Sequence, residues 1–222
     1  MFSRTLPRFL AASAIAAALS SLAALALPAS AQSSVVTLPT ANPPVHVRGT
    51  LVSADAKQIV VKSRDGRTVT LARANSLSIA EIYPIELKDI KQGSFIGTTG
   101  MPQPDGSQKA IEVHVFPPAL RGSGEGHYAW DLQPGSTMTN ADVAELAPAP
   151  ASVLGGRKLK LRYGGGEQTV VVPPGAPIVE IALADDKLLA PGAKVIVSVQ
   201  DRDGTPTATS LQAGRDGFTP PY

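Results

Sequence analysis

From Val45 onward, apolar and polar residues alternate with a period of two. Val45, Val47 and Leu51 fall on one side of the pattern, and the residues between them are mostly polar. Successive side chains of a strand point to opposite faces, so this alternation predicts a β-strand with one buried face. Similar alternation over residues 58–62 and 68–71 predicts two further strands.

Asp-Gly pairs separate several of these alternating runs. They stand at residues 65–66, 105–106 and 203–204. A tight turn between paired strands needs backbone angles with positive φ, which glycine adopts without steric cost, so each pair predicts a β-hairpin. The glycines of residues 163–166 predict another. Asp201 and Asp203 also resemble part of a calcium loop, but no closing Glu follows, and the hairpin interpretation is preferred.

The pattern repeats after about one hundred residues. Residues 58–62 correspond to 158–162, and residues 87–93 correspond to 186–192. Residues 87–93 and residues 186–192 are each followed by a predicted strand and then an Asp-Gly hairpin. A repeat of this length indicates two copies of one structural unit.

The predicted fold is therefore all-β, with two tandem small OB-like β-barrels. Short antiparallel strands must protect their edges, and closing into a barrel does so. We predict repeat 1 at residues 45–118, an ordered Gly- and aromatic-rich connector at 119–139, and repeat 2 with a C-terminal tail at 140–222. The alternative is a single β-sandwich made jointly by both copies.

The first residues are typical of an export signal. Arg4 and Arg8 precede an apolar, alanine-rich run, and small residues follow Pro28. We predict a signal peptide at residues 1–31, cleaved after Ala31, and a flexible lead-in at 32–44. An uncleaved anchor is the alternative, because the run approaches the length of a spanning helix. The expected location is periplasmic or secreted, without a membrane span after cleavage.

Charge and cysteine content exclude several classes of function. The chain has a formal net charge of +2, and the predicted signal carries two arginines and no acid, so the mature chain is formally neutral. A neutral domain lacks the electrostatic attraction that a phosphate backbone requires, which argues against nucleic acid as a partner. Because the chain has no cysteine, thiolate metal sites and thiol catalysis are excluded.

Candidate chemistry concentrates in the connector. His127, Tyr128 and Trp130, the only tryptophan, stand together and are predicted to contact a partner, an envelope protein or a ligand. Glu125, His127 and Asp131 also form a candidate oxygen and nitrogen ligand set for a divalent metal, the one cofactor considered. The competing interpretation is a tight turn that caps the interface between the barrels.

Other candidates are weaker. His46 and His114 are expected on outward polar faces, where the first and last strands of one barrel could bring the two imidazoles together as a shared metal site, although lone exposed histidines are more often simply solvated. Ser123 lies near His127 but lacks the strand-to-helix turn that exposes a nucleophilic serine. We therefore predict no catalytic residue.

The chain resembles a family of exported bacterial domains of unknown function with small OB-like barrels. The resemblance rests on the turn at residues 87–93 and the hairpin at 105–113. The runs at 121–127, 130–140 and 214–217 are similar to a two-repeat α-proteobacterial subgroup, often labelled "metal ABC transporter permease". A permease needs several spanning segments, which this sequence lacks beyond its signal. The resemblance implies no catalytic residues.

Together these observations predict a non-enzymatic exported periplasmic module that binds a partner or acts as a scaffold. The alternative is an accessory periplasmic metal-binding protein associated with a metal uptake system.

Overall fold

The computed structural model describes residues 44–222. The predicted signal peptide and almost all of the predicted lead-in lie outside this range. Within it, no helix is both long enough and apolar enough to cross a membrane. All regular structure in this range consists of β-strands and single 3₁₀ turns, which confirms the predicted all-β class.

Twelve strands and five 3₁₀ turns make up the described range. The strands are β1 (Val45–Ala54), β2 (Gln58–Ser63), β3 (Thr68–Pro84), β4 (Phe95–Pro102), β5 (Gln108–Val115), β6 (Gly126–Ala129), β7 (Thr137–Pro148), β8 (Arg157–Tyr163), β9 (Gly166–Val172), β10 (Ile178–Leu183), β11 (Lys194–Arg202) and β12 (Thr205–Gly214). The turns are η1 (Leu87–Asp89), η2 (Pro118–Leu120), η3 (Ala151–Val153), η4 (Asp186–Leu188) and η5 (Arg215–Gly217).

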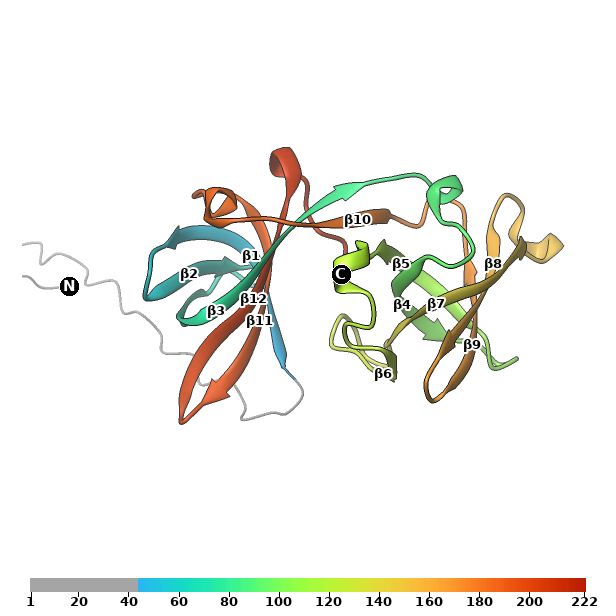
Figure 1. Ribbon diagram of the computed structural model, residues 1–222, viewed down its shortest axis with the longest axis horizontal. Coiled ribbons are helices and arrows are strands. Elements are labelled where there is room, and N and C mark those ends of the chain that lie inside the picture. The colour runs from blue at the N-terminus through green and yellow to red at the C-terminus, as the bar shows by residue number, and fades with distance from the viewer. Residues whose placement is uncertain (1–43) are drawn as a thin grey trace, which may run out of the picture. The chain divides into compact units, whose positions relative to one another are not determined.

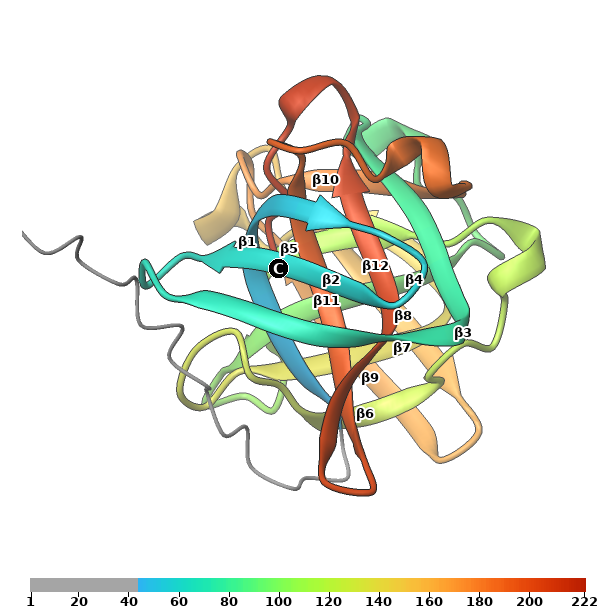
Figure 2. The same cartoon turned by 90° about the vertical axis from the view of Figure 1, so that its left-hand side faces the viewer.

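Five strands close into one mixed barrel, in the order β1-β2-β3-β12-β11 and back to β1. The β3–β12 pair is parallel and the other four pairs are antiparallel. Figure 2 looks toward these strands, with β12 and β11 crossing behind β2 and β3. Closure leaves no long unpaired edge in this set, as expected for a small barrel.

The barrel draws its strands from both predicted repeats. β1, β2 and β3 belong to residues 45–118, whereas β11 and β12 belong to 140–222. Its core is correspondingly mixed, because Leu51, Ile59 and Leu71 pack in the same buried cluster as Val197 and Leu211. The structure therefore does not show two tandem barrels. The physical reason is the parallel pairing of β12 with β3. Through this pair, the β11–β12 hairpin of the second half packs with strands of the first half.

The other seven strands lie outside this barrel. β4 and β5 form a hairpin, β7, β8 and β9 form a meander, and β4 pairs with β7. β9 also pairs with β5 in parallel over two residue pairs. β3 and β10 run antiparallel beside one another, and Figure 1 shows them side by side between the two groups of strands. A second buried cluster fills this part, with Ile96, Val143 and Leu161 among its members.

The predicted hairpins are confirmed. Asp203 and Gly204 join β11 to β12 as a two-residue turn, and both have positive φ. The turns at Gly66 and Gly106 also have positive φ. The corresponding segments 87–93 and 186–192 each begin with a 3₁₀ turn, η1 and η4. Local sequence chemistry therefore predicts the turns correctly even where it does not predict the strand partners.

Candidate functional site

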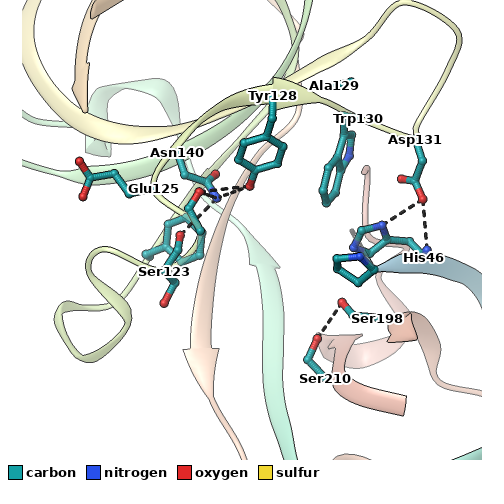
Figure 3. A pocket seen from close by; sticks show the side chains of 13 residues that line it. His46, Ser123, Glu125, Tyr128, Ala129, Trp130, Asp131, Asn140, Ser198 and Ser210 are labelled. Atoms are coloured by element: carbon teal, nitrogen blue, oxygen red, sulfur yellow. Dashed lines mark hydrogen bonds and ion pairs between the residues drawn. The ribbon is translucent and has the colours of Figure 1, made fainter. Parts of the chain in front are cut away.

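The connector folds back on β7 as the short strand β6. Tyr128 lies opposite Met138 in the β6–β7 pair, and the backbone N–H of Trp130 donates to the Ser136 carbonyl at 2.9 Å. Residues two apart on a strand point to the same side. The side chains of Tyr128 and Trp130 accordingly point the same way, into one cavity (Figure 3).

This aromatic cavity has a volume of about 590 Å³. β6 and the loops around it supply Tyr128 and Trp130, β1 supplies His46, and β11 and β12 supply Ser198 and Ser210. The full lining comprises Pro44, His46, Phe116, Ser123, Gly124, Glu125, Tyr128, Ala129, Trp130, Asp131, Asn140, Ser198 and Ser210. Its wall is mainly apolar with a few polar groups, which is the usual composition of a small-molecule pocket.

Aromatic rings form one wall of the cavity. The His46 and Trp130 ring centroids lie 4.3 Å apart with an interplanar angle of 44°, and the Tyr128 and Trp130 centroids lie 6.2 Å apart. Tyr128 remains 38% exposed. Ring faces in this arrangement offer contact area to a flat apolar ligand surface at little entropic cost.

Asp131 holds the β6 loop against β1. Its carboxylate accepts from the His46 N–H at 3.1 Å, lies 3.0 Å from His46 Nδ1, and accepts from the Arg48 guanidinium at 2.6 Å. Burial opposes ionisation of this carboxyl, but the His46 and Arg48 donors outweigh burial and hold its pKa well below the usual range. The ion pair thus fixes one side of the cavity.

Asn140 of β7 fixes the other side. Its side-chain amide donates to the carbonyl oxygens of Ser123 and Gly124 and lies 3.1 Å from the Tyr128 hydroxyl. The Tyr128 hydroxyl in turn donates to the Gly124 carbonyl. Burial raises the pKa of Tyr128 above its ordinary value.

The structure does not bring the three predicted metal ligands together. His127 Nδ1 lies 2.8 Å from the Thr139 hydroxyl, the Glu125 carboxylate accepts from the Gly164 N–H, and Asp131 is occupied by His46 and Arg48. Across residues 44–222, no group of three or more His, Cys, Asp or Glu side chains is arranged to hold a metal ion.

The predicted partner-contact residues separate into two groups. Tyr128 and Trp130 line the cavity, whereas His127, between them on the strand, points to the opposite side. Burial lowers the pKa of His127 and favours its neutral form. Ser123 lines the cavity, but the His127 ring is hydrogen-bonded to the Thr139 hydroxyl on the opposite side of the strand.

A smaller chamber of about 110 Å³ adjoins the aromatic cavity and was not predicted. The two share His46, Phe116, Trp130, Asn140 and Ser198 as lining residues. The chamber itself is lined by His46, His114, Phe116, Trp130, Met138, Asn140, Ile196, Ser198, Gln212 and Tyr222.

His114 departs from its expected place on a solvated outer face. It is only 3% exposed, because the ring of Tyr222 stacks on it at 4.5 Å and Phe116 packs edge-on at 4.9 Å. Its neighbour on the same face, Glu112, is fully buried. His46 lines the same chamber, so the two histidines approach one region, yet each turns its Nδ1 to a different carboxylate.

Comparison of the chain with protein-family models, with curated proteins and with solved structures finds no match.

Proposed function

We propose that this protein is a non-enzymatic, exported binding module of the cell envelope, and that the aromatic cavity is its ligand site. The observation that carries the proposal is the cavity itself, in which Trp130 and Tyr128 face an open space of about 590 Å³. Such a volume is within the range of small-molecule sites. The ligand class that fits is a small molecule, or the end of a larger one, with a flat apolar face.

The polar groups of the cavity support binding rather than catalysis. Asp131 is held by His46 and Arg48, and the amide nitrogen of Asn140 is used to fix the surrounding loop. The hydroxyls of Ser198 and Ser210 bond to each other at 2.8 Å. These groups hold the walls of the cavity in place. None of these contacts pairs a nucleophile with a base in the manner of a hydrolase.

We further propose that the strands outside the closed barrel form a second OB-like unit, so that the two copies exchange their last hairpins. Three features support this arrangement. The parallel β5–β9 pair corresponds to the β12–β3 pair, the bulge between Leu51 and Ser53 corresponds to that between Val143 and Glu145, and each set has its own core. The aromatic cavity would then lie where the two exchanged units meet.

The ligand site can be tested by tryptophan fluorescence. Trp130 is the only tryptophan in the chain, so any ligand-induced change in emission reports on the cavity wall. We expect a saturable change on titration with at least one of a panel of ring compounds, comprising hexoses, N-acetylated amino sugars, indole and benzyl alcohol.

Two variants define the outcome. Tyr128→Ala removes cavity wall and is expected to weaken binding at least about fivefold, consistent with loss of roughly 1 kcal/mol of aromatic contact. Leu183→Ala removes an exposed side chain of β10 outside the cavity lining and serves as the matched control. An unchanged emission across the whole panel, or equal weakening by both variants, would reject the cavity as the ligand site.

Export is tested separately. Periplasmic fractionation of the full chain and of a variant lacking residues 2–31 is expected to place only the full chain outside the cytoplasm. Recovery of both in the cytoplasm would reject export.

A further inference from the structure

Basic side chains gather on one outer face of the closed barrel. Val61 and Val195 point into the barrel core. Adjacent residues of a strand point to opposite faces, so their neighbours Lys62 and Lys194 point outward. Strand register places these two lysines on either side of Thr50 of β1, because β11, β1 and β2 are consecutive neighbours in the barrel (Figure 2). Two cations therefore flank one hydroxyl on the same face.

The two ammonium groups can reach one point above Thr50. Neighbouring strands lie about 4.7–4.9 Å apart, so the Cα atoms of Lys62 and Lys194 are separated by about 10 Å, and both side chains are long and flexible. Lys194 Nζ already donates to the Thr50 hydroxyl at 3.0 Å. That hydroxyl keeps its own hydrogen for another acceptor. An anion above Thr50 would thus meet the hydroxyl and both ammonium groups.

Arg64 adds a guanidinium group to the same face. Its backbone N–H donates to the Arg48 carbonyl at 2.9 Å, which places Arg64 beside the next outward position of β1. Its side chain donates to a neutral acceptor, the Pro220 carbonyl, at 2.9 Å. Burial and the charge of Arg48 both lower the pKa of Arg64. Asp131 balances the charge of Arg48, but Arg64 has no such counter-charge within the described range.

Thr50, Lys62, Arg64 and Lys194 are called the basic face below. Within residues 44–222, none of the ion pairs includes any of its three cations. Asp65, the acid next to Arg64 in the sequence, is paired with Arg67 instead. Like charges on neighbouring strands destabilise a sheet. A bound anion that neutralises them would therefore stabilise the folded protein.

The set of donors favours a phosphate group over other anions. A guanidinium group matches two phosphate oxygens with two parallel N–H donors, and lysine ammonium groups bind phosphate as point charges. A phosphomonoester carries three free oxygens and a charge of about −1.5 to −2 at neutral pH. A carboxylate offers two oxygens and a single negative charge, which leaves part of the basic face unsatisfied.

We propose that the basic face is a binding site for a phosphate group, carried either by a soluble molecule or by a lipid headgroup. Lys62 and Arg64 are exposed and Lys194 is half-buried, so the site is open to both sources. None of the four residues lines the aromatic cavity. The phosphate site is therefore separate from the proposed ligand site, and failure of one leaves the other standing.

Titration with sodium phosphate tests the site directly. Nitrogen-15 NMR spectra of the full chain are recorded at neutral pH and at fixed ionic strength. We expect saturable shifts of the backbone amides of the basic face, with a dissociation constant on the order of 1 mM, as three charge contacts in water provide. Titration with sodium chloride is the control and should leave these amides unchanged. Equal shifts with both salts, or phosphate shifts spread over the whole chain, would overturn the proposal.

Substitution of single lysines locates the binding. Lys62→Gln is expected to weaken phosphate binding at least about fivefold, because it removes one of three charges. Lys158→Gln is the matched control, since it removes an exposed lysine of β8 that lies near Asp105, and it should change the affinity less than about twofold. Equal losses in the two variants, or no loss in Lys62→Gln, would contradict the assignment to the basic face.

Co-sedimentation with vesicles distinguishes the two sources of phosphate. Phosphatidylcholine vesicles with and without phosphatidic acid are compared, because phosphatidic acid presents a phosphomonoester headgroup. Retention that requires phosphatidic acid and is lost in Lys62→Gln would assign the site to a lipid headgroup. Saturable phosphate shifts without retention on either vesicle would assign it to a soluble phosphorylated molecule. Absence of both effects would overturn the proposal.

Discussion

Gly97 is the residue on which the close packing of His114 and Asn140 depends most directly. It lies on β4, where its missing side chain leaves room for both His114 Nε2 and Asn140 Oδ1. A carbon atom at less than 3.0 Å from either atom cannot be accommodated without displacing it. Glycine at this position is therefore required by close approach of side chains and not by an unusual backbone angle.

We predict that Gly97→Ala destabilises the protein by roughly 1–3 kcal/mol, the usual cost of overpacking a filled interior. Urea unfolding followed by circular dichroism measures this value. Gly165→Ala is the control, because an added Cβ there meets only the Tyr163 ring at 3.5 Å or more, and it is expected to change stability by about 0.5 kcal/mol or less. Equal effects of the two substitutions would mean that His114 and Asn140 make room for the added methyl group without a loss of stability, which would contradict the prediction.

Asp131 predicts a pH dependence. Its pKa is depressed in the folded protein, so its contribution is present above its ordinary value near 4 and is lost as the pH falls below that value. Asp131→Asn is expected to lower stability by about 1 kcal/mol at neutral pH, a figure reduced for the exposure of this side chain, because two charge-assisted hydrogen bonds weaken.

Thermal unfolding from pH 7 to pH 3 measures this effect. The gap between the unsubstituted chain and Asp131→Asn should shrink below about pH 4, because the carboxyl takes up a proton there in the unfolded chain but stays ionised in the folded protein. Asp142→Asn disrupts an exposed ion pair with Arg121 and should have a smaller effect. A gap that persists unchanged at pH 3 would contradict the assigned role of the Asp131 charge.

At the scale of elements, the pairing of β12 with β3 distinguishes the observed fold from two tandem barrels. Leu211 of β12 is fully buried in a cluster with Leu51, Ile59 and Leu71. We predict that Leu211→Ala costs about 2–5 kcal/mol, the usual range for emptying such a site. Hydrogen exchange should show that protection falls more in β1, β2 and β3 than in β8 and β9. Loss concentrated in β8 and β9 would instead support a tandem arrangement.

The same element shows where prediction from the sequence ends. Alternation and Asp-Gly pairs are local signals, and they correctly predict strands and hairpins such as that at Asp203 and Gly204. The partner of a hairpin is set by contacts far apart in the chain. The apolar face of β12 could pack equally well on β3 or on its counterpart β9, because the two copies carry similar patterns.

The site was predictable to the same limited extent. Tyr128 and Trp130 stand out by residue type in a chain that is only 5% aromatic, and both line the cavity. Glu112 and His114 instead occupy alternate positions of a strand, where polar residues ordinarily indicate a solvated face. Only the packing of Tyr222 and Phe116 over His114 makes that face an interior one.

At the scale of the whole molecule, the pairing of strands from one half with strands from the other makes the two halves interdependent. The closed barrel needs β11 and β12 from the second half, and the remaining strands include β4 and β5 from the first. Neither half contains a complete closed sheet, and each would expose the edges and apolar faces that the other covers. The predicted repeats at 45–118 and 140–222 are thus units of sequence, and their independent folding is open to test.

We predict that fragments 44–122 and 123–222 are each unfolded when produced alone and fold when mixed. The break falls in the exposed loop before β6, so no strand is cut. Circular dichroism and size-exclusion chromatography should show little structure for either fragment and a 1:1 complex for the mixture. Trp130, carried only by the second fragment, should change its emission on mixing, because His46 and Phe116 beside it come from the first. If the two fragments fold separately and do not associate, the protein would consist of two tandem barrels. The residues of the cavity wall would then not be held together, which would rule out the shared cavity.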